Sequence, residues 1–233
     1  MKIIIRALLA TSFGLGLPIA AANAQSVTIG SDVPTNRALT IIFFGPVGQS
    51  FTSATDTLTS FGFEFTSLNP GSLNAPITFS LLAGETLTGT ALFNSAFTLP
   101  SSINSVNVQQ FFDIPLPNIS VVRGSRYTGM ITTTSERNAL LLGPGVDVQT
   151  GVLAGGDAFA GGRLLSAVPT GFTNCDTASS NCDANFRVTG NLVTAVPEPS
   201  TWAMLLVGFA GIGAMLRRRT TRRVSFDLNL GKG

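Results

Sequence analysis

One stretch of the chain alternates phenylalanine with small or polar residues. Within residues 58–66, Phe61, Phe63 and Phe65 alternate with a glycine, a glutamate and a threonine. Successive side chains of an extended strand point to opposite faces, so the three rings share one face. The pattern predicts a β-strand that buries these rings in a core.

Further short runs of this kind follow. Ile77, Phe79 and Leu81 repeat the alternation, and the body of the chain is rich in Gly, Ser, Thr and Phe but poor in charge, which favours strands and turns. Since no amphipathic helix separates the runs, we expect an all-β fold over residues 25–196, an antiparallel β-sandwich or jelly roll. The other expected strands are 39–44, 86–93, 106–114, 119–122, 127–133 and 186–193.

The first 24 residues have the parts of a secretory signal peptide. A positively charged start is followed by an apolar stretch, and Ala22 and Ala24 supply the small residues that a signal peptidase requires. We therefore predict a signal peptide over 1–24, cleaved before Gln25, and export across the inner membrane. The alternative is an uncleaved N-terminal anchor, for which the apolar stretch is short.

The segment between the two ends is acidic. Residues 25–196 contain six basic and ten acidic residues, a net charge of −4, although the whole chain has a formal charge of +2. Such a segment has no basic stripe with which to neutralise phosphates, so we expect no nucleic acid among its partners.

The chain has no histidine. A hydrolytic triad usually needs histidine as its base, and although paired carboxylates could cleave glycosidic bonds, no local motif joins two of them. Neither catalytic residues nor a metal or cofactor site is predicted, because the loop aspartates lack the spacing of a calcium loop. The carboxylates considered for catalysis are Glu64, Glu85, Asp113, Glu136, Asp147 and Asp157, and those considered for calcium are Asp147, Asp157, Asp176 and Asp183.

Cys175 and Cys182 are the only cysteines. In an exported chain this close spacing predicts a local disulfide, since a metal site would need further ligands. By the loop-entropy model the disulfide would contribute about 2–3 kcal/mol, so it would restrict one loop and would not hold the domain together.

The C-terminal part combines a proline-containing motif, an apolar stretch and an arginine cluster. Residues 202–216 carry no charge, and as a helix they would be about 22 Å long, shorter than the ~30 Å hydrocarbon core. With flanking residues to extend it, this stretch predicts a single transmembrane helix whose arginines lie in the cytoplasm. The residues expected to stop transfer at the membrane are Arg217, Arg218 and Arg219.

The tail begins with Pro197, Glu198 and Pro199, and Trp202 and Ala203 follow. In these residues it resembles the PEP-CTERM sorting signal in its Pro-Glu-Pro-x-x-Trp-Ala form. In that family a membrane-embedded exosortase is thought to recognise the motif and cut near it, in bacteria that make exopolysaccharide. The resemblance implies a sorting signal over 197–223, whereas the residues alone would favour a plain C-terminal anchor. A further extension, 224–233, has no assigned role. The motif is carried by Pro197, Glu198, Pro199, Trp202 and Ala203.

Short motifs of the body are similar to jelly-roll modules of bacterial surface proteins, some of which sit beside carbohydrate-binding domains. The likeness covers roughly residues 48–165 and implies a jelly-roll fold. The motifs are Gly48-Gln49-Ser50-Phe51-Thr52, then 58–63, 77–81 and 121–127, the last ending in Tyr127.

Two functions follow from these features. The first is a non-enzymatic envelope or extracellular-matrix protein, associated with exopolysaccharide or biofilm, that is tethered in the inner membrane until an exosortase releases it to the cell surface. The alternative is a carbohydrate-binding module on the cell surface, which would have to stack sugars on Tyr127 or on exposed phenylalanines. A hydrolase that uses a carboxylate pair is disfavoured.

Overall fold

The structure, a computed structural model, describes residues 24–143, 157–168, 182–193 and 199–224. Two units divide the chain. One is the compact body Ala24–Val193, and the other contains the helix α2 (Pro199–Val224). Each unit is described by itself.

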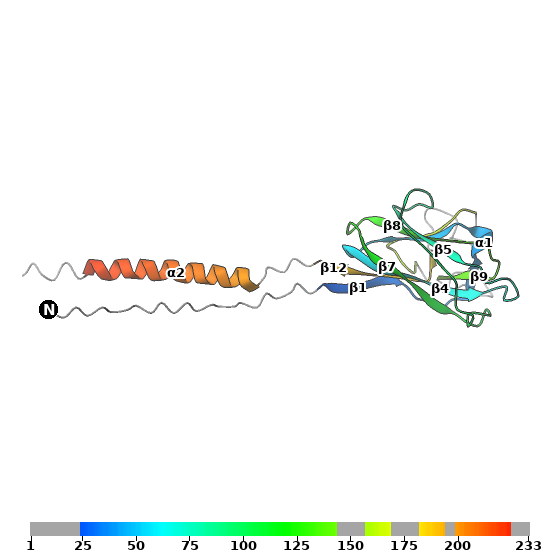
Figure 1. Ribbon diagram of the computed structural model, residues 1–233, viewed down its shortest axis with the longest axis horizontal. Helices are drawn as coiled ribbons and strands as arrows, with labels where there is room; N and C mark the ends of the chain where they lie inside the picture. Colours follow the sequence, from blue (N-terminus) through cyan, green and yellow to red (C-terminus); the bar gives the residue numbers. More distant parts are fainter. Residues whose placement is uncertain (1–23, 144–156, 169–181, 194–198, 225–233) are drawn as a thin grey trace, which may run out of the picture. The chain divides into compact units, whose positions relative to one another are not determined.

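The body is a sandwich of two antiparallel sheets (Figure 1). The first sheet runs β1–β12–β4–β9–β11, with β7 paired to β4 and β2 paired to β9, and the second runs β10–β3–β8–β5–β6. A single helical turn, α1 (Ile41–Phe44), follows β2. The strands are β1 (Gln25–Ser31), β2 (Arg37–Thr40), β3 (Val47–Thr52), β4 (Thr57–Ser67), β5 (Ile77–Ala83), β6 (Ala91–Phe97), β7 (Gln110–Ser120), β8 (Arg126–Thr133), β9 (Asn138–Gly143), β10 (Leu164–Ser166), β11 (Asp183–Ala184) and β12 (Phe186–Leu192).

The core lies between the sheets and is built around the rings of β4. Phe61, Phe63 and Phe65 are fully buried, as the alternation predicts. Phe61 contacts rings from both sheets, since its centroid lies 5.7 Å from that of Phe51 on β3 and 6.0 Å from that of Phe186 on β12. Aromatic rings at these separations add to the stabilisation that burial alone provides.

The first and last strands of the body are neighbours. Gln25 at the start of β1 pairs with Leu192 at the end of β12, and the register continues to Ser31 opposite Phe186 (Figure 1). Both ends of the body therefore leave from one end of the same strand pair.

The all-β, antiparallel sandwich is confirmed. The expected strands 58–66, 77–81, 127–133 and 186–193 correspond to β4, β5, β8 and β12. Alternation identified them because each of these strands has one face in the core.

Two expected strands are wrong in part. The run 39–44 is extended only to Thr40 and then forms the turn of α1, because an uninterrupted apolar run has no alternation that separates strand from helix. In 86–93 the strand begins only at Ala91, since Gly84 and Gly89 adopt positive φ angles of 86° and 126° that belong to a turn.

The expected strands 106–114 and 119–122 overlap one strand, β7, which starts at Gln110 and runs through two prolines. Pro115 and Pro117 lack an N–H, but β7 is an edge strand that pairs only with β4, so the missing donors are tolerated. The sequence pattern divided the strand at its prolines, whereas the sheet edge accommodates them.

Gly129 on β8 provides a test of this core. A Cβ at this position would lie 2.4 Å from the ring of Phe61, so we expect Gly129→Ala to destabilise the body by about 1–3 kcal/mol through overpacking. Chemical denaturation of the purified exported protein measures the change. Gly71→Ala is the matched control, because the nearest atom to its Cβ is 4.0 Å away. Equal stabilities of the two variants would contradict this account of the core.

Candidate functional site

The C-terminal helix contains most of the predicted sorting residues. α2 begins at Pro199, and Trp202, Ala203 and the arginines 217–219 all lie within it, while Pro197 and Glu198 lie outside the described residues. Proline suits the first turn of a helix, where its missing N–H has no intrahelical partner in any case. Among the described residues, no helix is both long and apolar enough to cross a membrane.

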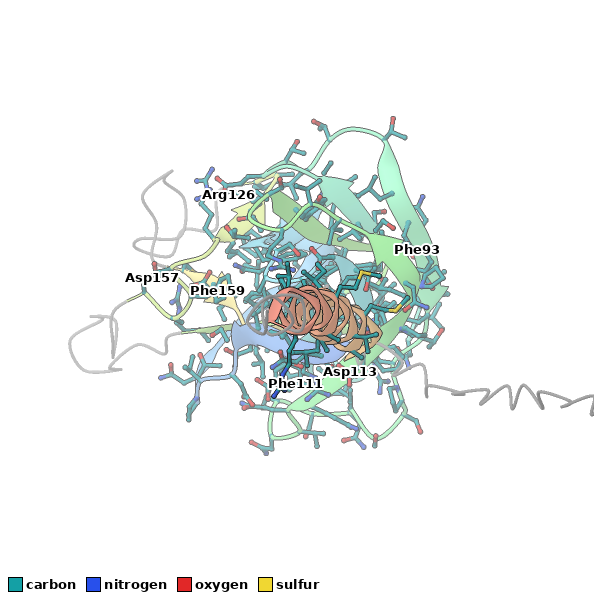
Figure 2. All side chains as sticks on the ribbon, turned by 90° about the vertical axis from the view of Figure 1, so that its left-hand side faces the viewer. Phe93, Phe111, Asp113, Arg126, Asp157 and Phe159 are labelled. Atoms are coloured by element: carbon teal, nitrogen blue, oxygen red, sulfur yellow. The ribbon has the colours of Figure 1, made fainter. Side chains whose placement is uncertain are left out.

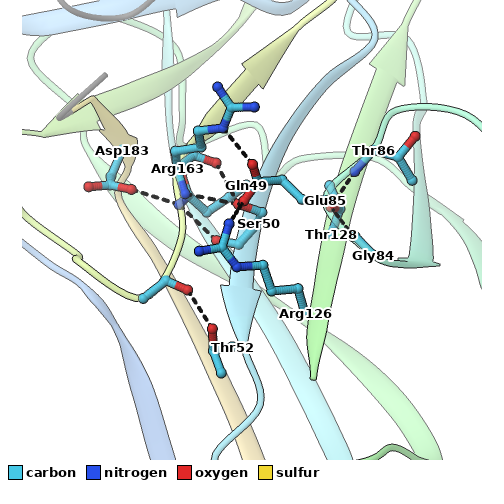
Figure 3. A network of polar contacts seen from close by, with 11 residues as sticks. Gln49, Ser50, Thr52, Gly84, Glu85, Thr86, Arg126, Thr128, Arg163 and Asp183 are labelled. Carbon is cyan, nitrogen blue, oxygen red and sulfur yellow. Dashed lines mark hydrogen bonds and ion pairs between the residues drawn. The ribbon is translucent and has the colours of Figure 1, made fainter. Parts of the chain in front are cut away.

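Gln49, the first polar residue of the Gln-Ser-Phe motif, ties the two sheets together. It lies on β3 and is fully buried. Its Nε2 donates to Asp183 Oδ1 of β11 at 2.7 Å (Figure 3). Its Oε1 accepts from the Ala184 N–H at 2.8 Å. A buried amide is stabilising only when its donors and acceptors are matched in this way. The motif residue therefore has a structural role.

Asp183 is a fully buried carboxyl group. Its Oδ2 accepts from the Phe159 N–H at 2.9 Å, and the same N–H contacts Asp157 Oδ1 at 3.0 Å. Burial, together with the neighbouring Asp157, raises the pKa of Asp183 to about 7 against the opposing hydrogen bonds from Gln49 and Phe159. Asp157 and Asp183, two acids considered for calcium, thus come together, although Asp157 is exposed and only Asp183 is buried.

Glu85 gathers a second polar cluster at the end of β5. Arg163 Nε donates to its Oε1 at 2.7 Å, Ser50 Oγ donates to its Oε2 at 3.1 Å, and Arg126 forms an ion pair with it (Figure 3). Burial alone would raise the pKa of Glu85, but the hydrogen bonds from Arg163 and Ser50 and the charges of the two arginines lower it overall. Glu85 is therefore fully engaged by its neighbours and is no free acid or base.

Tyr127 has a structural place as well. The side chain is only 6% exposed, and its hydroxyl accepts a hydrogen bond from the Val122 N–H at 2.8 Å. The ring lies 6.1 Å from that of Phe51, centroid to centroid. A sugar could not stack on this ring, so Tyr127 is excluded as the platform that a carbohydrate-binding module would need.

A row of residues crosses the outer face of the seven-stranded sheet. Arg187 on β12 lies between Gly30 on β1 and Gly62 on β4, and Gly62 in turn pairs with Asp113 on β7. The guanidinium of Arg187 reaches over Gly62 to Asp113, with Nε donating to Oδ1 at 2.7 Å and Nη2 pairing with Oδ2. Its Cζ also lies 4.6 Å from the centroid of the Phe111 ring.

Beside this row the surface is hollowed. The hollow has a volume of about 240 Å³, and β1 and the side chains of Phe111 and Arg187 line it. Figure 2 labels Phe111 and Asp113, which β7 presents together. We call this hollow, with Asp32, Phe111, Asp113 and Arg187 around it, the outer-face hollow.

Residues 195–219 match the family described as the PEP-CTERM protein-sorting motif. The chain carries a PEP-CTERM sorting signal. No curated protein matches the sequence. The signal implies an exported protein that an exosortase processes, which agrees with the resemblance read from the tail.

The described residues include only part of the predicted signal-peptide cleavage site and one of the two cysteines. Ala22 lies outside the described residues, Ala24 is the first described residue, and Gln25 begins β1, so cleavage before Gln25 stays a prediction. Cys182 is fully buried, and Arg37 Nη2 donates to its Sγ at 3.4 Å. Cys175 lies outside the described residues, so the disulfide also stays a prediction.

The structure places the candidate catalytic carboxylates mostly apart. Glu64 is half-buried and accepts a hydrogen bond from Asn185 Nδ2 at 2.7 Å. Burial raises the pKa of Glu64, the bond from Asn185 lowers it, and the charge of Asp32 raises it. Asp113 pairs with Arg187, and Glu136 accepts from Asn69 at 3.4 Å, whereas Asp147 and Asp176 lie outside the described residues. Within the described part of the chain, no three potential metal ligands gather.

Sequence reasoning missed the roles of Gln49, Asn185 and Gly62. Each acts through partners distant along the chain, such as Asn185 with Glu64, and no local pattern reveals them. The one available signal was Gly62 itself, a glycine within a strand, which often marks a close approach by another group.

Asp183 makes the stability of the body depend on pH. Its pKa is about 7 in the folded state against an ordinary 3.8, so between these values the folded protein binds the extra proton and stability falls as pH rises. This contribution has a slope of up to about 1.4 kcal/mol per pH unit, and Asp183→Asn should remove it. Denaturation curves at pH 5 and pH 8 measure the difference between the two proteins.

Glu85→Gln is the control for this series. The pKa of Glu85 is lowered on folding, so its contribution to stability has the opposite sign and is lost as pH falls. Parallel pH profiles of the wild type and Asp183→Asn would contradict the raised pKa of the buried Asp183.

The predicted disulfide is tested by counting thiols. If Cys175 and Cys182 are bonded, titration of the denatured, unreduced exported protein should find no free thiol, and reduction should release two. Because the closed loop is short, Cys175→Ser should lower stability by only about 2–3 kcal/mol. Two free thiols before reduction would rule out the bond.

Proposed function

We propose that the chain is a non-enzymatic protein of the cell envelope or extracellular matrix, delivered to the surface through its PEP-CTERM signal and associated with exopolysaccharide or biofilm. The observation that carries this proposal is the sorting motif at residues 195–219. The body adds support from its chemistry, since the carboxylates of Asp183 and Glu85 are engaged in buried or ion-paired contacts typical of structure.

We further propose that residues 202–216 hold the protein in the inner membrane until cleavage, with Arg217, Arg218 and Arg219 on the cytoplasmic side. The described side chains of α2 are apolar and exposed from Met204 to Leu216, apart from small residues among them. Such a surface needs an apolar environment, and lipid provides one. A signal peptide over 1–24 would deliver the body to the outer side.

The second candidate function is carbohydrate binding at the cell surface. The outer-face hollow favours it, because it combines a phenylalanine with charged and hydroxyl-bearing neighbours on an exposed face. Polar groups around an aromatic ring are the usual means of holding a sugar. This candidate is compatible with the first, because a matrix protein can act by binding the matrix polymer.

The processing proposal is tested by intact mass. In cells with an active exosortase, the wild-type exported form should lack everything from about Pro197 onward. Replacement of Pro197, Glu198 and Pro199 by alanine should leave the whole tail in place and keep the protein in the inner membrane, because the Pro-Glu-Pro motif that an exosortase would recognise is lost. Membrane fractionation reports the location.

Pro70→Ala is the matched control, since Pro70 lies in an exposed loop of the body and belongs to no sorting motif. It should be processed like the wild type. A full-length tail on the mature wild-type protein, or normal cleavage of the variant with alanine at residues 197–199, would contradict the processing proposal.

A further inference from the structure

The outer-face hollow depends on a missing side chain. A Cβ at Gly62 would lie 2.3 Å from Asp113 Oδ1 and 3.2 Å from Arg187 Cγ, so only glycine lets the ion pair cross β4. The pair lies flat over the strand and draws Arg187 onto the Phe111 ring, 4.6 Å from its centroid. The side chains around the hollow are therefore held in one arrangement.

Stability alone gives little reason for this arrangement. The side chains of Arg187 and Asp113 are each 43% exposed, and exposed ion pairs contribute little to stability. Gly62 carries a cost in a strand, where it lacks a side chain to pack. An ordered cation–carboxylate pair that solvent can still reach is instead preorganised for binding a ligand, because its side chains have little freedom left to lose.

The polar side chains around the outer-face hollow are suited to bind the hydroxyl groups of a ligand. Asp113 presents acceptors and Arg187 presents donors, and both Asp32 and Thr28 line or flank the hollow. Next to them, Thr28 and Thr189 share a hydrogen bond of 2.9 Å between their hydroxyls on the same face. Neighbouring sugar hydroxyls donate and accept in the same way, and charged partners form the stronger hydrogen bonds.

The charge around the hollow disfavours acidic polymers. Two carboxylates, Asp113 and Asp32, act on the single guanidinium of Arg187, and the charge of Asp32 also acts on the neighbouring Glu64. A uronate or sulfate group brought here would meet this negative excess, and like charges in contact oppose binding.

We propose that the outer-face hollow is a binding site for a neutral hexose polymer. One sugar ring lies against Phe111, and its hydroxyls bond to Arg187 and Asp113. The inference rests on the second candidate function, which it deepens by naming the residues and the ligand class. It is independent of the sorting signal, because every group involved lies in the body.

The test uses the purified exported protein in affinity electrophoresis through gels that contain glucan, mannan or galactan, with alginate as the acidic polymer. Retardation by at least one neutral polymer and none by alginate is expected. Phe111→Ala and Arg187→Gln should each weaken the apparent affinity by about tenfold or more, the loss of one charge-assisted hydrogen bond or of the stacking ring. Asp113→Asn, which keeps the shape of the site, should act in the same direction.

Matched controls lie elsewhere on the body. Phe43 is an exposed phenylalanine, and Arg123 is an exposed arginine paired with Asp56 at 2.6 Å. Phe43→Ala and Arg123→Gln should bind like the wild type. Thermal melts confirm that each variant is folded before its affinity is compared.

The possible results of this experiment distinguish between the site, the ligand class and the carbohydrate-binding function. Binding that Phe111→Ala, Arg187→Gln and Asp113→Asn all leave unchanged would overturn the site while keeping the carbohydrate-binding function. Preference for alginate would overturn the ligand class. If no neutral polymer retards the wild type, both the proposed site and the carbohydrate-binding function are wrong. The sorting proposal is tested separately, by the mass of the mature protein.

Discussion

The contact of the Phe61 ring with both sheets is the constraint on which the sandwich depends. The ring lies against the backbone of Gly129 on β8, and its centroid is 5.2 Å from that of Phe79 on β5. Because Gly129 has no side chain, the two sheets can approach until a single ring fills the space. Truncation of such a buried ring costs about 3–5 kcal/mol, which is comparable to the whole stability of many domains.

Polar ties fix how the sheets align around that ring. Gln49 joins β3 to β11, and Asn185, the residue between β11 and β12, donates to Glu64 and to the Val33 carbonyl at 2.8 Å. The Asn185 backbone accepts from the Glu64 N–H and donates to the Leu141 carbonyl. A buried polar network is favourable only in the one alignment that satisfies all its members, so it selects the register that apolar packing alone leaves open.

The sequence predicted the fold class because alternation reports on one strand at a time. Phe61, Phe63 and Phe65 identify β4 without any knowledge of its neighbours. β9 (Asn138–Gly143) went unrecognised because it is buried along its whole length and so has no alternation to detect. Such patterns do not predict which strands pair with each other. Arg187 and Asp113, for example, meet only because β12 and β7 flank β4. The sorting motif could be recognised because its residues are contiguous, whereas the outer-face hollow is assembled from distant segments.

The arrangement of the chain ends explains how a sorted protein keeps its working surface. β1 starts at Gln25 opposite Leu192, so a cut before Gln25 and another beyond Val193 would remove no strand of the sandwich. The outer-face hollow is built partly from these same terminal strands, with Thr28 to Asp32 on one side and Arg187 beside them. A cut only a few residues inside either boundary would therefore damage the hollow before it reached the Phe61 core. The predicted processing sites and the hollow are thus linked through the β1–β12 pair, so the positions of the two cuts would affect the proposed binding surface as well as delivery.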